Sequence, residues 1–231
     1  MNSRGLLTLA ACAAIALGIG TVGAAVLWHD ELVQPQTRSA PPPDDLPVAF
    51  VLTQGSTMID FAGPWEVFQD VMLTEGGGMR HPFRLYVVSD SRKPIRASGG
   101  MQILPDYTFE DAPPPKIVVV PAQRGAPQVA DWLRRTRKDA EVVMSVCTGA
   151  FQLTEAGLLD GKPATTHHDY LDRFATRFPN VKLQRGLRFV KSDDVVYTSG
   201  GLSSGIDLAL HIVERYFGRA VAEQTAIYME Y

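Results

Sequence analysis

The sequence has very little cysteine: Cys12 and Cys147 are the only two among 231 residues. Two cysteines are too few for a disulfide-stabilised scaffold, and no cluster of cysteine and histidine has the spacing of a structural zinc site. A basic excess is also missing, because 22 lysines and arginines stand against 25 aspartates and glutamates, for a net charge of −3. Nucleic-acid-binding proteins usually carry a basic footprint, so nucleic acid is not an expected partner.

Internal repeats are absent as well, and the rest of the composition is ordinary. Hydrophobic residues make up 45% of the chain and charged residues 20%. These values lie close to the averages for globular proteins, which excludes disordered, collagen-like and coiled-coil chains. The length suits one substantial domain.

The residues from Gly5 to Trp28 carry no charge and follow Arg4. This run is long enough to span a bilayer as a helix, and it also fits a signal peptide. We therefore predict a signal peptide or an N-terminal membrane anchor over residues 1–29. Either segment places the following chain outside the cytoplasm, in the periplasm, because the positive flank stays inside. Cys12 ends a lipobox-like Leu-Ala-Ala-Cys, so it is either a lipidation site or a membrane-buried residue.

Residues 30–46 are polar and rich in proline, with Pro41, Pro42 and Pro43 at their centre. Such composition favours extended conformations and is typical of a semi-rigid linker. We therefore predict a folded domain over residues 47–231.

Strand and helix patterns alternate along this domain. Apolar runs predict strands at 48–53, 83–88, 117–120, 141–146, 189–191 and 195–198, and a Gly-Gly turn predicts a hairpin over 95–104. Helical periodicity predicts helices at 61–73, with Pro64 in the first turn, and at 127–138, 148–159, 203–217 and from 220 onward. Alternation of this kind predicts an α/β fold, a three-layer α/β/α sandwich with a mostly parallel sheet.

Cys147 lies where such a fold places an active site. The segment Val142–Ala150 passes from an apolar strand directly into a helix through small residues, as in a nucleophile elbow. A cysteine at a helix N-terminus is expected to have a lowered pKa, because the helix dipole and free N–H groups stabilise the thiolate. The alternative is a structural cysteine that fills a gap between strand and helix.

Three other side chains are candidate partners for this thiol. Asp60 follows the first predicted strand, so it lies at the same sheet edge, where it would move a proton or else cap the following helix. His167 and His168 follow another strand-like stretch, and either would serve as a general acid or base or polarise the thiolate.

Four segments together resemble the PfpI-like, class I glutamine amidotransferase-like superfamily. Its isonitrile hydratase-like branch and the amidase-like domains of AraC-type regulators are the most similar members. The segments are Ile59–Phe68 (IDFAGPWEVF), Ser145–Gly161 (SVCTGAFQLTEAGLLDG), Ala164–His167 (ATTH) and Thr198–Arg215 (TSGGLSSGIDLALHIVER). The resemblance implies a flavodoxin-like fold with a nucleophile elbow.

The resemblance also implies roles for individual residues. Cys147 would be the nucleophile, Asp60 the acidic residue facing it, and Thr148 a donor to the substrate through its backbone N–H and its hydroxyl. His167 matches a histidine near the cysteine in other members. The implied reaction adds water to a small-molecule isonitrile and yields an N-substituted formamide, without a metal or organic cofactor. Cys147 is followed by Thr148 rather than histidine, which disfavours protease activity.

Two departures from the superfamily pattern fall near this site. The loop 121–125 reads Pro-Ala-Gln-Arg-Gly where many relatives have Gly-Gly, so we expect Gln123 and Gly125 to contact substrate. His168 stands where hydratase-like members often have tryptophan, which makes the predicted pocket wall more polar.

Other functions remain open at this stage. One is a non-catalytic ligand-binding or sensing domain like those of the regulators, and another is a deglycase or redox-stress protein in which Cys147 is oxidised. Members of the superfamily often dimerise, so a second copy of the chain is a candidate partner, although no surface stripe identifies an interface.

Overall fold

The computed structural model describes residues 46–231. The predicted signal peptide or anchor, Cys12 and almost all of the predicted linker lie outside the described residues. Within residues 46–231, no helix combines the length and the apolar character that crossing a membrane requires.

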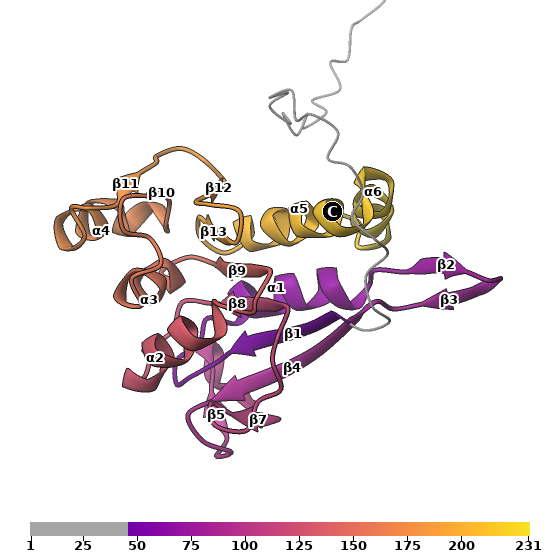
Figure 1. The fold of residues 1–231 in the computed structure, drawn as a ribbon, viewed down its shortest axis with the longest axis horizontal. Helices are drawn as coiled ribbons and strands as arrows, with labels where there is room; N and C mark the ends of the chain where they lie inside the picture. The colour runs from indigo at the N-terminus through magenta and orange to yellow at the C-terminus, as the bar shows by residue number, and fades with distance from the viewer. Residues whose placement is uncertain (1–45) are drawn as a thin grey trace, which may run out of the picture. The chain divides into compact units, whose positions relative to one another are not determined.

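A seven-stranded sheet forms the centre of the domain (Figure 1). Its strands are β1 (Leu46–Val51), β4 (Phe83–Ser89), β7 (Tyr107–Thr108), β8 (Ile117–Val120), β9 (Val142–Ser145), β12 (Phe189–Lys191) and β13 (Val196–Ser199). Their order across the sheet is β12-β13-β9-β8-β1-β4-β7, and every neighbouring pair is parallel except β12 and β13. Ligands bind at the carboxyl ends of the strands in parallel sheets, and Cys147 follows the carboxyl end of the parallel strand β9.

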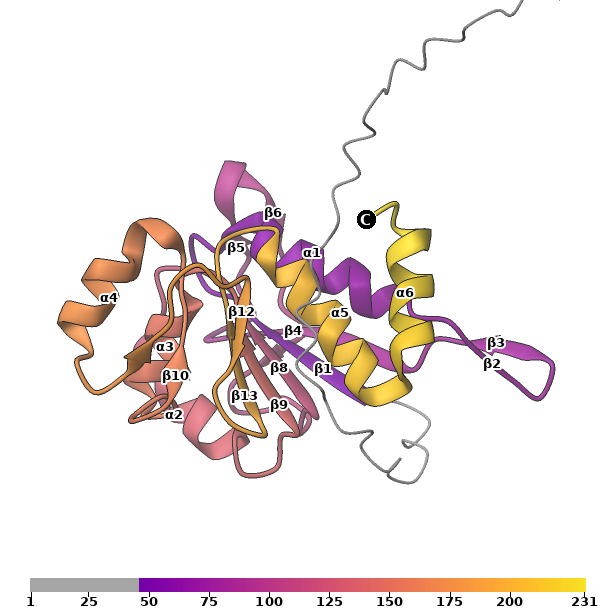
Figure 2. The same cartoon turned by 90° about the horizontal axis from the view of Figure 1, so that it is seen from above.

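Both faces of this sheet are buried, and successive residues of β1 alternate between two hydrophobic cores. Val48 and Phe50 belong to one core, whereas Ala49 and Val51 belong to the other. Helices cover each face (Figures 1 and 2). The first core takes residues from α1 (Met58–Gln69), α5 (Ser204–Phe217) and α6 (Arg219–Tyr228), and the second from α2 (Pro127–Thr136), α3 (Gly149–Glu155) and α4 (Leu171–Arg177). The chain thus has the predicted three-layer, flavodoxin-like α/β/α fold.

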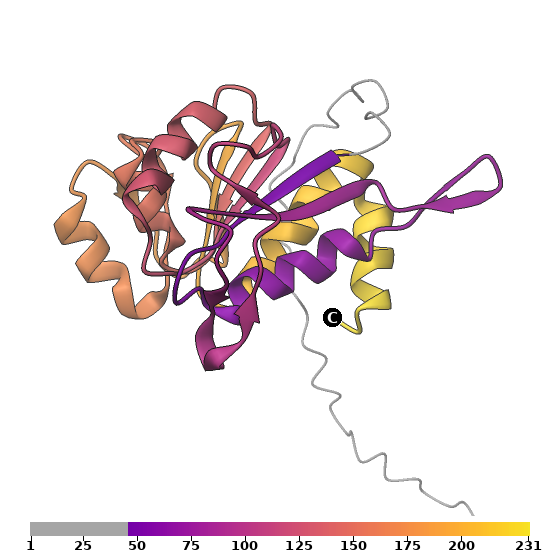
Figure 3. The ribbon, with the colours of Figure 1, turned by 90° about the horizontal axis from the view of Figure 1, so that it is seen from below.

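Short elements surround the central sheet. The predicted Gly-Gly hairpin is present as β5 (Ile95–Arg96) and β6 (Gln102–Ile103), joined by the 3-10 turn η1 (Ser98–Gly100). A second hairpin, β2 (Leu73–Glu75) and β3 (Gly78–Arg80), projects away from the layers (Figure 3). The remaining elements are a parallel pair, β10 (Pro163–Ala164) and β11 (Lys182–Leu183), and the 3-10 turn η2 (His168–Tyr170).

Helices α1 and α5 pack closely because glycines lie where they meet. A Cβ on Gly63 of α1 would lie 2.8 Å from Ile206 of α5, and one on Gly205 of α5 would lie 3.3 Å from Pro64 of α1. The prediction that Pro64 occupies the first turn of α1 is wrong, because the helix begins at Met58 and Pro64 lies in its interior. The earlier start places Asp60, rather than Pro64, in the first turn, facing the end of the sheet.

Candidate active site

Cys147 occupies the sharp turn between β9 and α3 in a strained backbone conformation. Its φ is +59°, a value that residues with a Cβ rarely adopt. Two hydrogen bonds fix the turn: the Cys147 N–H donates to the Gly200 carbonyl at 2.8 Å, and the Thr166 hydroxyl donates to the Cys147 carbonyl at 2.9 Å. The side chain is 6% exposed. This geometry is that of a nucleophile elbow.

Gly149 explains why small residues follow the cysteine. A Cβ at this position would lie 2.1 Å from the Val120 carbonyl oxygen, so any side chain would collide with the backbone at the end of β8. The tight turn from strand to helix therefore requires glycine two residues after Cys147.

Asp60 is fully buried and faces Cys147 from the first turn of α1. Its Oδ2 accepts a hydrogen bond from the Ala122 N–H at 3.1 Å, whereas Oδ1 has no partner of ordinary hydrogen-bond geometry in the described chain. Burial raises the pKa of the Asp60 carboxyl to about 6, although the Ala122 N–H, the Cys147 thiol and the Leu202 N–H act to lower it. Asp60 does not cap the helix, since Thr57 is at the N-cap and makes no side-chain cap.

The Cys147 thiol holds its proton more tightly than an ordinary cysteine. Burial raises the pKa of Cys147 to about 12, and the negative charge of Asp60 acts in the same direction. The N–H groups of Thr148 and Leu202 oppose this rise without reversing it. The expectation of a lowered thiol pKa is therefore wrong. Helix α3 has only seven residues, and a carboxylate faces the sulfur.

Leu202 is the part of this site that sequence patterns missed. Its N–H interacts with both Asp60 and Cys147, and its φ is +54°, a second left-handed residue beside the same pair. Two signals in the sequence point to it: Gly200-Gly201 immediately before it marks a loop with unusual backbone freedom, and the residue lies in the superfamily-like segment Thr198–Arg215.

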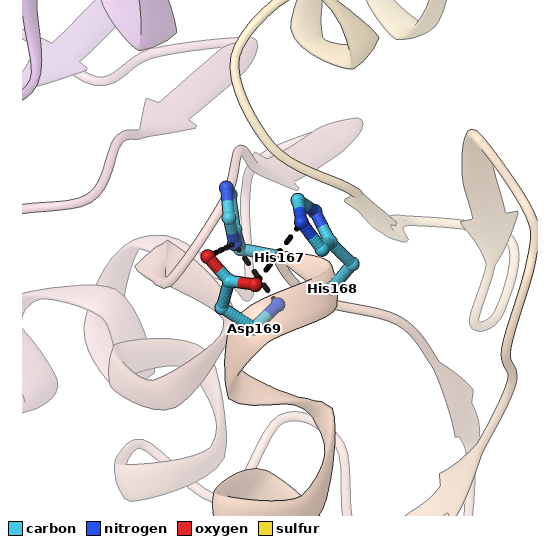
Figure 4. A group of neighbouring side chains, drawn as sticks. All are labelled: His167, His168 and Asp169. Carbon is cyan, nitrogen blue, oxygen red and sulfur yellow. Dashed lines mark hydrogen bonds and ion pairs between the residues drawn. The ribbon is translucent and has the colours of Figure 1, made fainter.

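His167 contacts the loop that contains Gly201 and Leu202 rather than the Cys147 thiol. A Cβ on Gly201 would lie 2.1 Å from the Cδ2 of His167, so the imidazole packs closely against the backbone before Leu202. Its Nδ1 accepts a hydrogen bond from the Asp169 N–H at 3.2 Å. Among the hydrogen bonds of residues 46–231, none joins His167 or His168 to Cys147 or Asp60. The two imidazoles stack on each other, with ring centroids 4.4 Å apart (Figure 4).

His167, His168 and Asp169 are a group of potential metal ligands within the described chain, with ligand atoms within 4.8 Å of one another. The rings of the histidines are nearly parallel, at 26°, and the Asp169 carboxylate lies beside them, paired with His168 Nε2 at 3.1 Å (Figure 4). Because no hydrogen bond within residues 46–231 joins either histidine to Cys147 or Asp60, we assign this group no catalytic step.

Gln123 and Gly125 line a cavity of about 460 Å³ that also contains Thr148 but neither Cys147 nor His168. The amide of Gln123 is already used by the protein. Its oxygen accepts from the Thr53 hydroxyl at 3.0 Å and from the Ser56 hydroxyl at 2.9 Å, and its nitrogen donates to Val51 at 3.0 Å. Gln123 therefore ties the cavity loop to the end of β1. We call this space the arginine cavity, and its lining residues are Gln123–Ala130 except Gln128, together with Thr148, Phe151, Gln152, Glu155, Tyr170, Arg173 and Arg177.

Comparison with known proteins identifies relatives of this chain. The model of the DJ-1/PfpI family matches residues 47–215. An isonitrile hydratase from Pseudomonas putida is 31% identical over 192 residues, which cover 80% of this chain and 78% of the relative. The HTH-type transcriptional regulator CdhR from Pseudomonas aeruginosa is 30% identical over 149 residues, which cover 62% of this chain but only 44% of the regulator.

Solved structures share the fold of this chain. The crystal structure of a THiJ/PfpI family protein from Pseudomonas syringae superposes with a TM-score of 0.70 at 25% identity, covering 85% of this chain and 83% of the other. The crystal structure of an AraC family transcriptional regulator from Pseudomonas putida shares the fold, with a TM-score of 0.69 at 17% identity over 80% of this chain and 99% of the other.

Proposed function

Because the chain belongs to the DJ-1/PfpI family, we propose that it is a cofactor-independent cysteine enzyme that adds water to isonitriles and releases N-substituted formamides. The similarity to an isonitrile hydratase over most of both chains supports this reaction. The observation that carries the proposal is the buried pair of Asp60 and Cys147, in which the proton resides on sulfur and a carboxylate faces it.

This protonation state matches what an isonitrile requires. The terminal carbon of R–N≡C must gain both a proton and a nucleophile, since the reaction is a 1,1-addition at that one carbon. The S–H of Cys147 supplies both parts: Asp60 carries the thiol proton to the carbon, and the thiolate that is left attacks the same carbon. The first step forms one C–H and one C–S bond and gives a covalent thioimidate, R–N=CH–S–Cys147.

Water completes the reaction. It adds to the thioimidate carbon while Asp60 accepts one water proton and passes it to the nitrogen, and the remaining hydroxyl proton then moves through Asp60 to the sulfur as the C–S bond breaks, which releases R–NH–CHO and regenerates the thiol. The N–H groups of Thr148 and Leu202 face the sulfur, where they stabilise the thiolate as it forms and leaves. A pKa of about 6 leaves Asp60 ionised at neutral pH, so that it can accept a proton in each half of the reaction.

The test is turnover of alkyl and aryl isonitriles by the full chain, followed as growth of the formyl proton signal in NMR spectra. Cys147→Ala is expected to lower turnover to the background rate, a loss of about 10⁴-fold or more. Cys147→Ser keeps the shape of the side chain and serves as the matched variant, with most of the activity also lost. Absence of turnover across the panel, or full turnover by Cys147→Ala, would disprove the reaction.

A second candidate function is ligand sensing without chemistry. The observation that favours it is that Cys147 does not line the arginine cavity, and relatives include transcriptional regulators. Specific ligand binding by the wild-type chain without turnover, unchanged in Cys147→Ala, would support this function over the enzyme. A peroxide-sensing role has less support, because a raised thiol pKa leaves little of the thiolate that oxidants attack.

We also propose that the enzyme works outside the cytoplasm. The uncharged run from Gly5 to Trp28 behind Arg4 supports export. Fractionation of cells that express the full chain tests this proposal, and recovery of the protein only in the cytoplasmic fraction would contradict it.

A further inference from the structure

The arginine cavity lies next to the reaction centre, by which we mean Asp60, Cys147 and the N–H groups of Thr148 and Leu202. Thr148 belongs to both regions, because its N–H faces the Cys147 sulfur and the residue lines the cavity. From there the cavity lining continues over the loop before α2 and the first turn of that helix, side chains of α3, and α4 as far as its last residue, Arg177. A volume of about 460 Å³ lies within the range of small-molecule binding sites. A substrate with its reactive carbon at Cys147 would place its remaining groups here.

The charges that line this cavity are not balanced. Three arginines and one glutamate line it. Arg177 and Glu155 form an ion pair at 2.6 Å and neutralise each other. Across the described residues, the guanidinium groups of Arg124 and Arg173 have no ion-pair or hydrogen-bond partner. Two uncompensated positive charges therefore face one cavity in a chain whose net charge is −3, which attracts a small anion.

One wall of the same cavity is aromatic. Phe151 and Tyr170 both line it, and their rings meet edge to face with centroids 6.4 Å apart. Phe174 and Phe178 support Phe151 from behind, with ring centroids 5.0 Å and 5.7 Å away. This packing holds an apolar surface next to the positive charges, which suits a ligand that has an apolar group close to an anionic one.

We propose that the arginine cavity binds a carboxylate of the substrate, so that the substrate class is isonitriles that bear a carboxylate and an aromatic or branched side chain. Arg124 and Arg173 bind the carboxylate, and Phe151 and Tyr170 contact the apolar group. The identity of the reactive group rests on the proposed function, whereas carboxylate binding rests on the cavity alone.

A carboxylate fits the cavity better than a phosphate. Glu155 adds a negative charge to the wall and reduces the net positive charge to that of the two free guanidinium groups. The aromatic wall beside these charges favours an anion that is attached to an apolar group, as in an aromatic carboxylic acid, over free inorganic phosphate. The guanidinium group also pairs with a carboxylate through two parallel hydrogen bonds, which fixes the orientation of the ligand.

Binding of a stable product analogue tests the inference without any turnover. The probe is N-formylphenylalanine, the formamide that an aromatic α-isocyano acid would yield, and its neutral control is N-formylphenylalaninamide. Isothermal titration calorimetry compares the wild-type full chain with Arg124→Gln/Arg173→Gln. A matched variant, Arg135→Gln/Lys138→Gln, removes two positive charges from exposed positions outside the cavity.

We expect the acid to bind the wild-type chain at least about tenfold more tightly than the amide, since charge-assisted hydrogen bonds supply the difference. The cavity double variant is expected to lose that preference, and the matched variant to keep it. High salt should weaken binding of the acid and leave binding of the amide unchanged. Circular dichroism and thermal melting of both double variants confirm that the fold persists.

Three results would overturn the inference: equal affinity for acid and amide, an unchanged preference in the cavity double variant, and competition by inorganic phosphate as strong as by the acid. The proposed reaction fails separately. If no isonitrile is turned over but the acid binds through the two arginines, the carboxylate inference is supported and the proposed hydration is disproved. If isonitriles are turned over but the acid is not bound in preference to the amide, the proposed hydration is supported and the carboxylate inference is disproved.

Discussion

The reaction centre and the arginine cavity are neighbours that treat charge in opposite ways. Around Asp60 and Cys147, burial shifts both pKa values upward, and Oδ1 of Asp60 has no partner of ordinary hydrogen-bond geometry within residues 46–231. In the arginine cavity, by contrast, Arg124 and Arg173 are exposed to solvent. The contrast shows how one site can separate chemistry from recognition. The buried pair of Asp60 and Cys147 carries out the reaction, and the exposed arginines select the substrate. Thr148 joins the two regions.

The substitution with the largest expected effect on this contrast is Asp60→Asn. It removes the negative charge that opposes ionisation of the Cys147 thiol. Turnover should fall about 10²- to 10⁴-fold, because the proton carrier is lost. The pKa of Cys147 should fall at the same time, since the negative charge of Asp60 helps to raise it. Alkylation of Cys147 by iodoacetamide should therefore become faster at a fixed pH, while turnover becomes slower.

Glu66→Gln is the matched control for this experiment. Glu66 lies on the same helix as Asp60 but is exposed, so neither turnover nor alkylation should change. Slower alkylation in Asp60→Asn, or alkylation as slow as in the wild type, would show that Asp60 does not set the charge of the thiol.

Stability against pH sharpens the comparison by measuring the cost of burying Asp60. Its pKa rises from 3.8 in the ordinary carboxyl to about 6 in the folded chain, so the folded chain binds this proton more tightly. The resulting stabilisation is present below about pH 4 and is lost as pH rises through about 6, a change of about 3 kcal/mol. Asp60→Asn lacks this titration.

The measurement is urea unfolding of the wild type and Asp60→Asn across this pH range. Groups common to both chains cancel in the difference between their free energies of unfolding. The wild type should lose about 3 kcal/mol relative to the variant between about pH 4 and pH 7. A difference that stays constant with pH would mean that Asp60 titrates normally in the folded chain.

The smallest expected effect comes from a substitution that changes the packing beside Cys147 without changing any charge. Gly149→Ala places a Cβ against the Val120 carbonyl oxygen, and we expect a loss of about 2 kcal/mol in the free energy of unfolding. Gly161→Ala is the control, because Gly161 has a φ of +70° but no atom within 4 Å of its Cβ position. It should lose about 1 kcal/mol. Equal losses in thermal or urea unfolding would show that crowding at the elbow is unimportant.

Sequence patterns predicted much of the fold because its strands are buried on both faces. The apolar run Ile117–Val120 is a strand over the predicted residues, and the helix expected from residue 61 begins only three residues earlier, at Met58. The same reasoning brought Asp60 and Cys147 to one sheet edge, since both follow parallel strands. Local pattern and topology agree at these positions.

The remainder depends on tertiary contacts that no local pattern contains. Helix α4 was not predicted, because seven residues are too few for a clear helical period. Without α4, the approach of Tyr170 and Arg173 to the loop 121–125 could not be foreseen, and neither could the arginine cavity. The direction of the Cys147 pKa was missed for a related reason: a helix N-terminus is visible in sequence, whereas the depth at which a carboxylate is buried is not.

The left-handed backbone of Cys147 has a further consequence, for how the sequence tolerates change. A φ of +59° costs a side-chain-bearing residue on the order of 1 to 2 kcal/mol, and glycine would adopt it freely. Cysteine at this position therefore opposes stability and favours reactivity. Selection for thermal resistance alone should replace Cys147 with glycine or asparagine, whereas selection for turnover should retain cysteine. Residue 147 thus reports which of the two pressures a population of variants has experienced.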